Sequence, residues 1–162
     1  MTAQQTQLPV ETPPSLLSAI RGFRQKQAYK NKAAEWVMLT LFVSGLLLWE
    51  TLPVSWPIFR SALFFHVIAG LIIFPLTTGL FWWAHRRLLV NNKKPFLRIT
   101  GQALDWLLGL CFLTGLILSF WGATGNVAGE WISNTHWMTG LLLGPLMLRH
   151  AWRFSVLRHL FN

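Results

Sequence analysis

Four long apolar stretches alternate with short polar or basic segments along this chain of 162 residues. The stretches run over about 34–52, 58–84, 102–121 and 131–152. A helix that crosses a bilayer needs roughly 20 consecutive apolar residues, so each stretch is long enough to cross once. The pattern therefore predicts an all-α fold in which residues 34–162 form an integral membrane four-helix bundle.

The apolar stretches form a tandem repeat of two units, each with two predicted spans. Residues 34–84 match residues 104–154 at a constant offset of 70 without a gap. The identical pairs include Trp36 with Trp106, Phe42 with Phe112, Gly45 with Gly115, His66 with His136, Gly70 with Gly140, Pro75 with Pro145 and Trp82 with Trp152. Because each unit crosses the membrane twice, both units point the same way, and an axis along the membrane normal would relate them.

Residues 1–33 precede the repeat and have a different character. Residues 1–14 are polar and rich in proline, which predicts disorder. Residues 15–32 predict an amphipathic helix that lies on the membrane surface and binds lipid. Its apolar face is made by Leu16, Leu17, Ile20 and Phe23, and basic residues occupy its other faces. The alternative is an ordinary cytosolic tail with basic flanks.

Composition supports a membrane protein and gives its orientation. The chain is 53% hydrophobic and only 12% charged, whereas a soluble domain carries about 25% charged residues. The formal charge is +9, and the basic residues gather in both terminal segments and in the loop 86–98. Basic segments stay in the cytoplasm, so both termini are predicted to be cytoplasmic. Nucleic-acid binding is not expected, because the basic residues do not share one folded face.

The repeat places two histidines at the same depth. His66 and His136 are equivalent under it, and two inward imidazoles at one depth are what a six-coordinate haem iron needs. Gly70 and Gly140 follow one helical turn later on the same face, which leaves room for a flat macrocycle.

Gly45 and Gly115 offer the same room from the first and third spans. Glycines in membrane helices also serve close helix packing, and that is the alternative interpretation. An ionisable residue in lipid, however, is a functional hypothesis by default. Cys111 is the only cysteine, so the chain has no C-x-x-C-H motif for covalent haem attachment.

A second pair of histidines lies near the predicted cytoplasmic ends of the same spans. His85 and His150 each have an arginine beside them, Arg86 and Arg149, and arginine pairs with carboxylates such as haem propionates. These residues predict a possible second haem. The alternative is that they are interfacial residues at basic helix ends.

The spacing of the two pairs differs between the repeat units. His66 precedes His85 by 19 residues, whereas His136 precedes His150 by 14. At 100° per residue the two rotations differ by about 140°. A kink at Pro75 could reduce this difference.

The five acidic residues form no paired-carboxylate site, and the chain has no Ser-His-Asp set and no phosphate-binding loop. Nothing therefore predicts a hydrolase or a transferase. Glu35 and Asp105 are expected at helix starts, where the helix dipole favours a negative charge.

Ser44-Gly45-Leu46, Thr114-Gly115-Leu116 and the H-x3-G motifs at His66 and His136 resemble those of the bacterial four-helix b-type cytochromes. These are the cytochrome b561-like and formate-dehydrogenase-gamma-like membrane subunits, and the resemblance covers about 34–154. It implies a subunit of the bacterial inner membrane that passes electrons between quinone and partner redox subunits. It also implies haem b with His66 and His136 as axial ligands. Many of these relatives place a further ligand histidine in the first span, whereas spans one and three here contain none.

Two other functions compete with electron transfer. A cofactor-free anchor or assembly subunit of a larger complex would fit the short loops, which leave no room for a catalytic domain. A small transporter with a histidine proton site would be expected to carry more polar residues at mid-membrane. The repeated His-Gly pair favours the cytochrome.

Overall fold

The computed structural model describes residues 16–27, 31–49, 51–90, 93–122, 125–152 and 155. Among these residues there is no β-strand, and helices account for nearly all of them. The all-α prediction is therefore confirmed. The predicted disorder of residues 1–14 lies outside the described residues.

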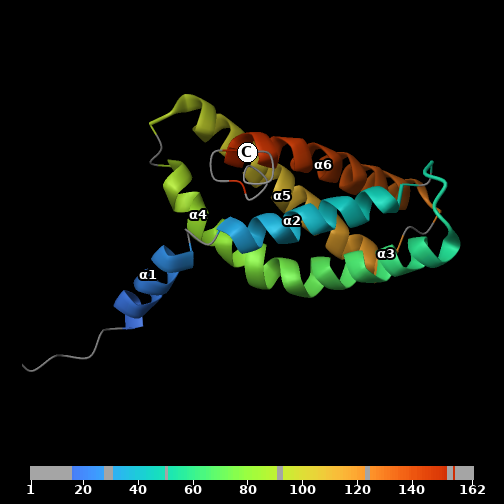
Figure 1. The fold of residues 1–162 in the computed structure, drawn as a ribbon, viewed down its shortest axis with the longest axis horizontal. Helices are drawn as coiled ribbons and strands as arrows, with labels where there is room; N and C mark the ends of the chain where they lie inside the picture. The colour runs from blue at the N-terminus through green and yellow to red at the C-terminus, as the bar shows by residue number, and fades with distance from the viewer. Residues whose placement is uncertain are drawn as a thin grey trace, which may run out of the picture.

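Six α-helices and two π-helical turns make up the described chain (Figure 1). They are α1 (Leu16–Gln27), α2 (Asn31–Leu47), α3 (Trp56–Ile68), η1 (Ala69–Ile73), η2 (Pro75–Gly79), α4 (Leu80–Val90), α5 (Pro95–Trp121) and α6 (Val127–Ala151). The π turns join α3 to α4 without a break. Figure 1 shows α2 and α5 running one way, and α3–α4 and α6 running back, with α1 beside the α4 end of the bundle.

Helix boundaries differ from the predicted spans because capping residues set them rather than hydropathy. The predicted surface helix ends at Gln27 instead of 32, and α2 already begins at Asn31. α5 begins at Pro95, ahead of its predicted apolar start at 102, because proline suits the first helical turn. α6 begins at Val127, where the Asn126 side chain accepts a hydrogen bond from the Gly129 N–H at 2.8 Å.

The first π turn ends just before Pro75, and the second begins at it. Proline has no N–H to donate and clashes with a preceding α-helical turn. A π turn holds about one residue more than an α turn. Each π turn therefore rotates the side chains that follow it by about −100° around the helix axis. The rotation from His66 to His85 then falls from about +100° to about −100°, against about −40° in the second unit. The difference between the two repeat units in the rotation from the first histidine to the second therefore falls from about 140° to about 60°.

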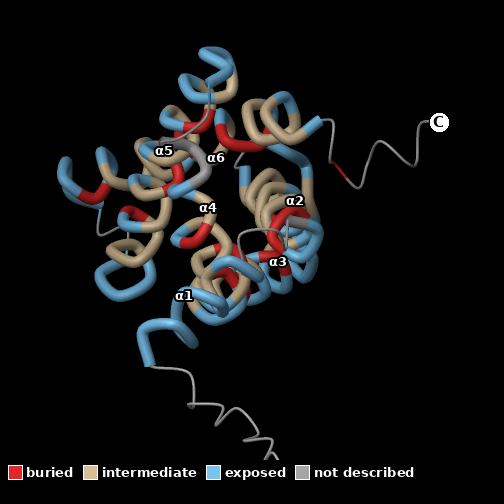
Figure 2. Tube along the Cα trace, turned by 90° about the vertical axis from the view of Figure 1, so that its left-hand side faces the viewer, coloured by how far each residue is buried: buried red, intermediate tan, exposed pale blue. Residues whose placement is uncertain are grey.

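Small and polar side chains are buried, while many of the largest apolar ones face outward. Ala69 and Ala84 are 3% and 1% exposed, and Thr78 is 4% exposed. By contrast, Trp106 is 80% exposed and Phe120 is 83% exposed. Figure 2, which looks along the helices, shows buried positions facing neighbouring helices and exposed ones facing away. The largest buried apolar side chains form one small cluster of Phe74, Leu108 and Leu143.

By length and composition, two helices of the described chain can cross a membrane. They are the continuous helix Trp56–Arg87 and α5. α2 has only 17 residues, and α6 has 25 residues but a more polar sequence.

The repeat is visible in how the helices pack. Phe42 of α2 lies over Gly144 of α6, and the equivalent Phe112 of α5 stacks on Phe74 with ring centroids 5.1 Å apart. Gly144 and Phe74 are themselves equivalent positions under the offset of 70. Equivalent phenylalanines thus contact equivalent positions, which hold a glycine in one case and a phenylalanine in the other.

We expect Gly144→Ala to lower stability, because its Cβ would lie 2.5 Å from Cε2 of Phe42. Overpacking of this kind costs about 1–3 kcal/mol. Thermal unfolding in detergent, followed by circular dichroism, should show a lower midpoint for Gly144→Ala. Phe42→Leu in the same background should restore part of the loss.

Gly109→Ala is the matched control, because its Cβ would meet Trp82 at an ordinary 3.7 Å. Equal midpoints for Gly144→Ala and Gly109→Ala would contradict the close packing of α2 on α6.

Candidate functional site

The structure brings His66 of α3 and His136 of α6 together. Their ring centroids are 6.2 Å apart, and the ring planes stand at 87° to each other. Both side chains are partly buried. The repeat therefore has a spatial counterpart: equivalent residues from the two units meet between the helices.

A hydroxyl group on the neighbouring helix contacts Nδ1 of each ring. Ser44 Oγ lies 2.9 Å from His66 Nδ1, and Thr114 Oγ1 lies 3.2 Å from His136 Nδ1. Each hydroxyl already donates its single hydrogen to a carbonyl of its own helix: Ser44 to Leu41 O at 3.1 Å, and Thr114 to Leu110 O at 2.8 Å. The hydroxyl oxygens must then accept, so both histidines carry their hydrogen on Nδ1.

Backbone carbonyls one turn earlier support the same assignment. His136 Nδ1 lies 2.9 Å from the carbonyl oxygen of Cys111, which can only accept. Leu41, the residue equivalent to Cys111, is the backbone group that interacts with His66. A neutral imidazole protonated on Nδ1 has a free lone pair on Nε2, which is the atom that can bind a metal.

Gly45 and Gly115 let the rings approach their neighbouring helices. A Cβ on Gly45 would lie 3.2 Å from His66 Cε1, and one on Gly115 would lie 2.9 Å from His136 Cε1. Sequence reasoning gave this room to a macrocycle, whereas in the structure the imidazole rings occupy it.

Gly70 and Gly140 are less crowded. The nearest atoms to a Cβ there would be Leu41 Cδ2 at 4.0 Å and Cys111 Sγ at 3.9 Å, which are ordinary contacts. Packing within the protein therefore does not require glycine at these two positions.

The second pair of histidines lies at the other end of the same helices. His85 stacks on Phe81, with centroids 4.9 Å apart, and is within electrostatic range of His150. His150 Nδ1 lies 2.8 Å from Thr100 Oγ1, which donates to Phe96 O at 2.8 Å. By the same reasoning as before, His150 carries its hydrogen on Nδ1 and has a free Nε2.

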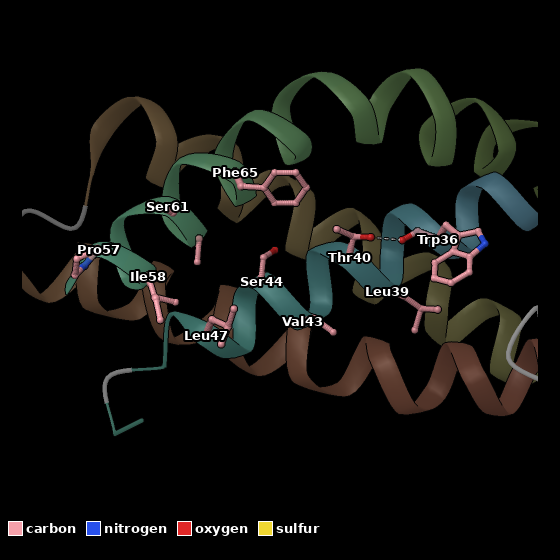
Figure 3. Close-up of a pocket in the computed structure, with 11 residues that line it drawn as sticks. Trp36, Leu39, Thr40, Val43, Ser44, Leu47, Pro57, Ile58, Ser61 and Phe65 are labelled. Atoms are coloured by element: carbon pink, nitrogen blue, oxygen red, sulfur yellow. Dashed lines mark hydrogen bonds between the residues drawn. The ribbon is translucent and has the colours of Figure 1, made fainter. Parts of the chain in front are cut away.

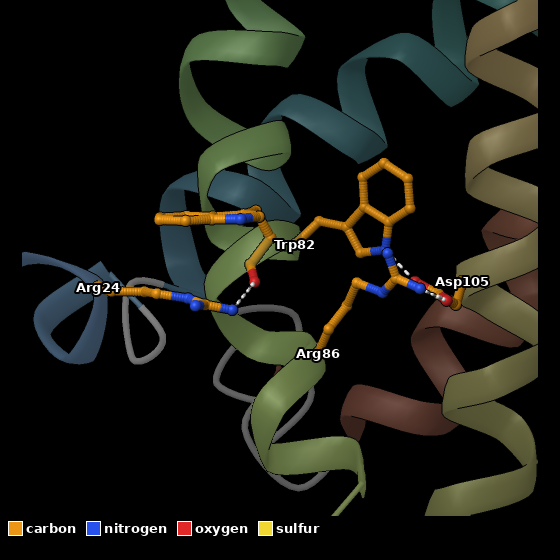
Figure 4. A network of polar contacts seen from close by, with 5 residues as sticks. Arg24, Trp82, Arg86 and Asp105 are labelled. Atoms are coloured by element: carbon orange, nitrogen blue, oxygen red, sulfur yellow. Dashed lines mark hydrogen bonds and ion pairs between the residues drawn. The ribbon is translucent and has the colours of Figure 1, made fainter. Parts of the chain in front are cut away.

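The two arginines beside this pair have protein partners. Arg86 pairs with Asp105, with Nη2 and Oδ2 3.0 Å apart, and Arg149 lies over the Phe96 ring at 5.0 Å. Asp105 also accepts a hydrogen bond from Trp82 Nε1 (Figure 4). Because α5 starts at Pro95, Asp105 lies about three turns inside the helix, and its expected place at a helix start was wrong.

Sequence reasoning missed several contacts at this end of the molecule. Asp105 and Glu35 are equivalent under the repeat, and buried Glu35 accepts a hydrogen bond from Ser155. Arg24 of α1 lies 4.3 Å from the centre of the Trp83 ring, which ties α1 to α4. The sequence signal for these contacts was that Glu35 and Asp105 occupy equivalent positions of the repeat, which indicates that both carboxylates have partners.

A shallow groove of about 680 Å³ runs between α2 and α3 (Figure 3). Its lining is mostly apolar, with Trp36, Leu47 and Phe65 among the larger side chains. Ser44 also borders the groove, so the groove reaches the group that contacts His66.

Within the described ranges no cluster of three or more metal-ligating side chains occurs. Two imidazoles suit haem, because the macrocycle supplies the remaining ligands. Comparison with protein-family models, with curated proteins and with solved structures finds no match to this chain.

Proposed function

We propose that this protein is a membrane-embedded b-type cytochrome subunit that transfers electrons between a quinone pool and partner redox subunits. One observation carries the proposal: His66 and His136 meet with their rings 6.2 Å apart, and each has a free Nε2.

The residues present fit haem b. His66 and His136 would hold the haem iron through their Nε2 atoms, and their ring centroids are 6.2 Å apart, so the two imidazoles are close enough to share one ion. Gly70 and Gly140 follow the two histidines by one helical turn, and protein packing does not require glycine at either position. Bound haem would supply one-electron chemistry at its iron.

The protein's own part is to hold the rings and keep water away. Ser44 and Thr114 keep the hydrogen on Nδ1, and on His136 the Cys111 carbonyl accepts it as well. Hydrogen bonding at Nδ1 fixes the ring and strengthens Nε2 as a ligand. The surrounding apolar helices keep the site dry, which controls its redox potential.

The packing supports a four-helix bundle in the membrane. In lipid, burying large apolar side chains brings no advantage, so helices associate through small residues and hydrogen bonds. Buried Ala69, Thr78 and Ala84, together with outward Trp106 and Phe120, follow that rule. In this arrangement α2, α3–α4, α5 and α6 are the four spans, and α1 lies on the cytoplasmic surface.

A second haem between His85 and His150 extends the proposal. Its support is their proximity, the free Nε2 of His150 and the rotation introduced by the π turns around Pro75. Of the two expected propionate partners, Arg149 lies over Phe96, and Arg86 would have to share its charge with Asp105.

The first test is an absorption spectrum of the purified protein, oxidised and then dithionite-reduced. Wild type should show six-coordinate low-spin haem b, and His66→Ala and His136→Ala should each abolish the contribution of the haem held by this pair, because one of its two ligands is lost. His159→Ala, beyond the last apolar stretch, is the control and should retain it. A protein without haem would favour the cofactor-free anchor.

Gly70→Ala separates haem binding from folding. Its Cβ would meet no atom closer than 4.0 Å, so the fold should persist. Loss of haem with unchanged circular dichroism would assign this space to the macrocycle, and full haem retention would contradict that assignment.

Haem per polypeptide, from a pyridine haemochrome assay against protein mass, tests the second site. We expect a ratio near two in wild type, falling to one in His150→Ala. A wild-type ratio near one would reject the inner haem and leave His85 and His150 as interfacial residues.

Reporter fusions test the orientation, which rests on the Lys and Arg distribution. A fusion at residue 162 should report the cytoplasm, and one in the 122–134 loop should report the periplasm. The opposite pattern would reverse the side assigned to each histidine pair.

A further inference from the structure

Each imidazole ring of the His66–His136 pair contacts the neighbouring helix of its own repeat unit. Ser44 and Gly45 of α2 contact the Nδ1 and Cε1 edge of His66. Thr114 and Gly115 of α5 contact the same edge of His136. A hydroxyl and a glycine, adjacent in sequence, therefore face one edge of each ring.

These contacts fix the plane of the ring. Without them, the χ2 torsion of a histidine side chain has a broad distribution with roughly two-fold symmetry. A half-turn of the ring would replace Nδ1–H by a carbon at the hydroxyl and lose the hydrogen bond. The glycine side leaves little free space, because even a Cβ would lie within 3.2 Å of the His66 ring and 2.9 Å of the His136 ring.

We propose that Ser44 and Thr114 are positioning residues that hold the two axial imidazole planes of the haem nearly perpendicular. The observed angle between the planes is 87°. This inference rests on the proposed function, since it concerns how the same two histidines bind haem. It adds the residues that set ligand orientation, a task that outer hydrogen-bond partners perform at metal sites.

The angle between axial ligand planes has a spectroscopic signature. In low-spin ferric haem, parallel planes split the two iron orbitals that interact with the imidazoles, which gives a rhombic electron paramagnetic resonance spectrum. Perpendicular planes leave those orbitals nearly equal in energy, which gives one strongly anisotropic signal. The spectrum therefore reports the geometry that Ser44 and Thr114 are proposed to hold.

The experiment records this spectrum for oxidised wild type, Ser44→Ala and Thr114→Val in detergent. His150→Ala is added to each if a second haem contributes. Wild type should give the anisotropic signal, and each variant should shift towards a rhombic one. Haem retention should weaken about 10–100-fold, the usual cost of losing such a partner.

Conservative variants and a matched control complete the design. Ser44→Thr and Thr114→Ser keep a hydroxyl and should restore the wild-type signal. Thr40→Val removes a hydroxyl one turn from Ser44 that donates to Trp36 O of its own helix at 2.7 Å, and it should leave the spectrum unchanged.

The outcomes distinguish the two proposals. A wild-type protein with bis-histidine haem but a rhombic spectrum would overturn this inference and leave the proposed function standing. The same conclusion follows if Ser44→Ala and Thr114→Val both match wild type. A protein that binds no haem would overturn both. The wild-type spectrum reports the angle by itself, so the inference can be tested even if a variant fails to accumulate.

Discussion

Contact between a histidine ring and a glycine of the neighbouring helix is the constraint on which the site depends. Gly45 and Gly115 have no side chain, so α2 lies close to His66 and α5 lies close to His136. That closeness brings the adjacent hydroxyls, Ser44 and Thr114, within hydrogen-bonding distance of Nδ1. Nε2 is then left as the free nitrogen on both rings.

The same physical rule governs the rest of the helix packing. If the helices lie in a membrane, as we propose, they gain little by burying leucine and gain more from close backbone approach. Ala62, Ala69 and Thr139 are accordingly buried between helices, and Phe64 and Trp131 face outward. Interhelical hydrogen bonds of histidine and tryptophan then supply the specificity that a large apolar core supplies in soluble proteins.

The repeat units are closely alike at one end and differ at the other. Around His66 and His136 the glycine, hydroxyl and carbonyl contacts correspond one for one. At the other end, Asp105 binds Trp82 and Arg86, whereas its equivalent Glu35 binds Ser155. Pro75 begins a π turn, whereas Pro145 lies inside a continuous α-helix. We propose the haem site at the symmetric end, and at the divergent end the two units make different contacts.

The sequence alone determined the helical class, the repeat and the equivalence of His66 with His136, because a periodic apolar pattern and a fixed offset need no three-dimensional information. It placed helix ends less well, since α5 begins at Pro95 and α6 follows its N-cap Asn126, both outside the apolar stretches. Only the tertiary structure decided that Gly45 and Gly115 receive imidazole rings, that Ser44 and Thr114 set the ring tautomer, and that Asp105 is tied to Arg86. The reason is that these contacts join different helices, and their geometry follows from interhelical distance and rotation, which a hydropathy pattern does not contain.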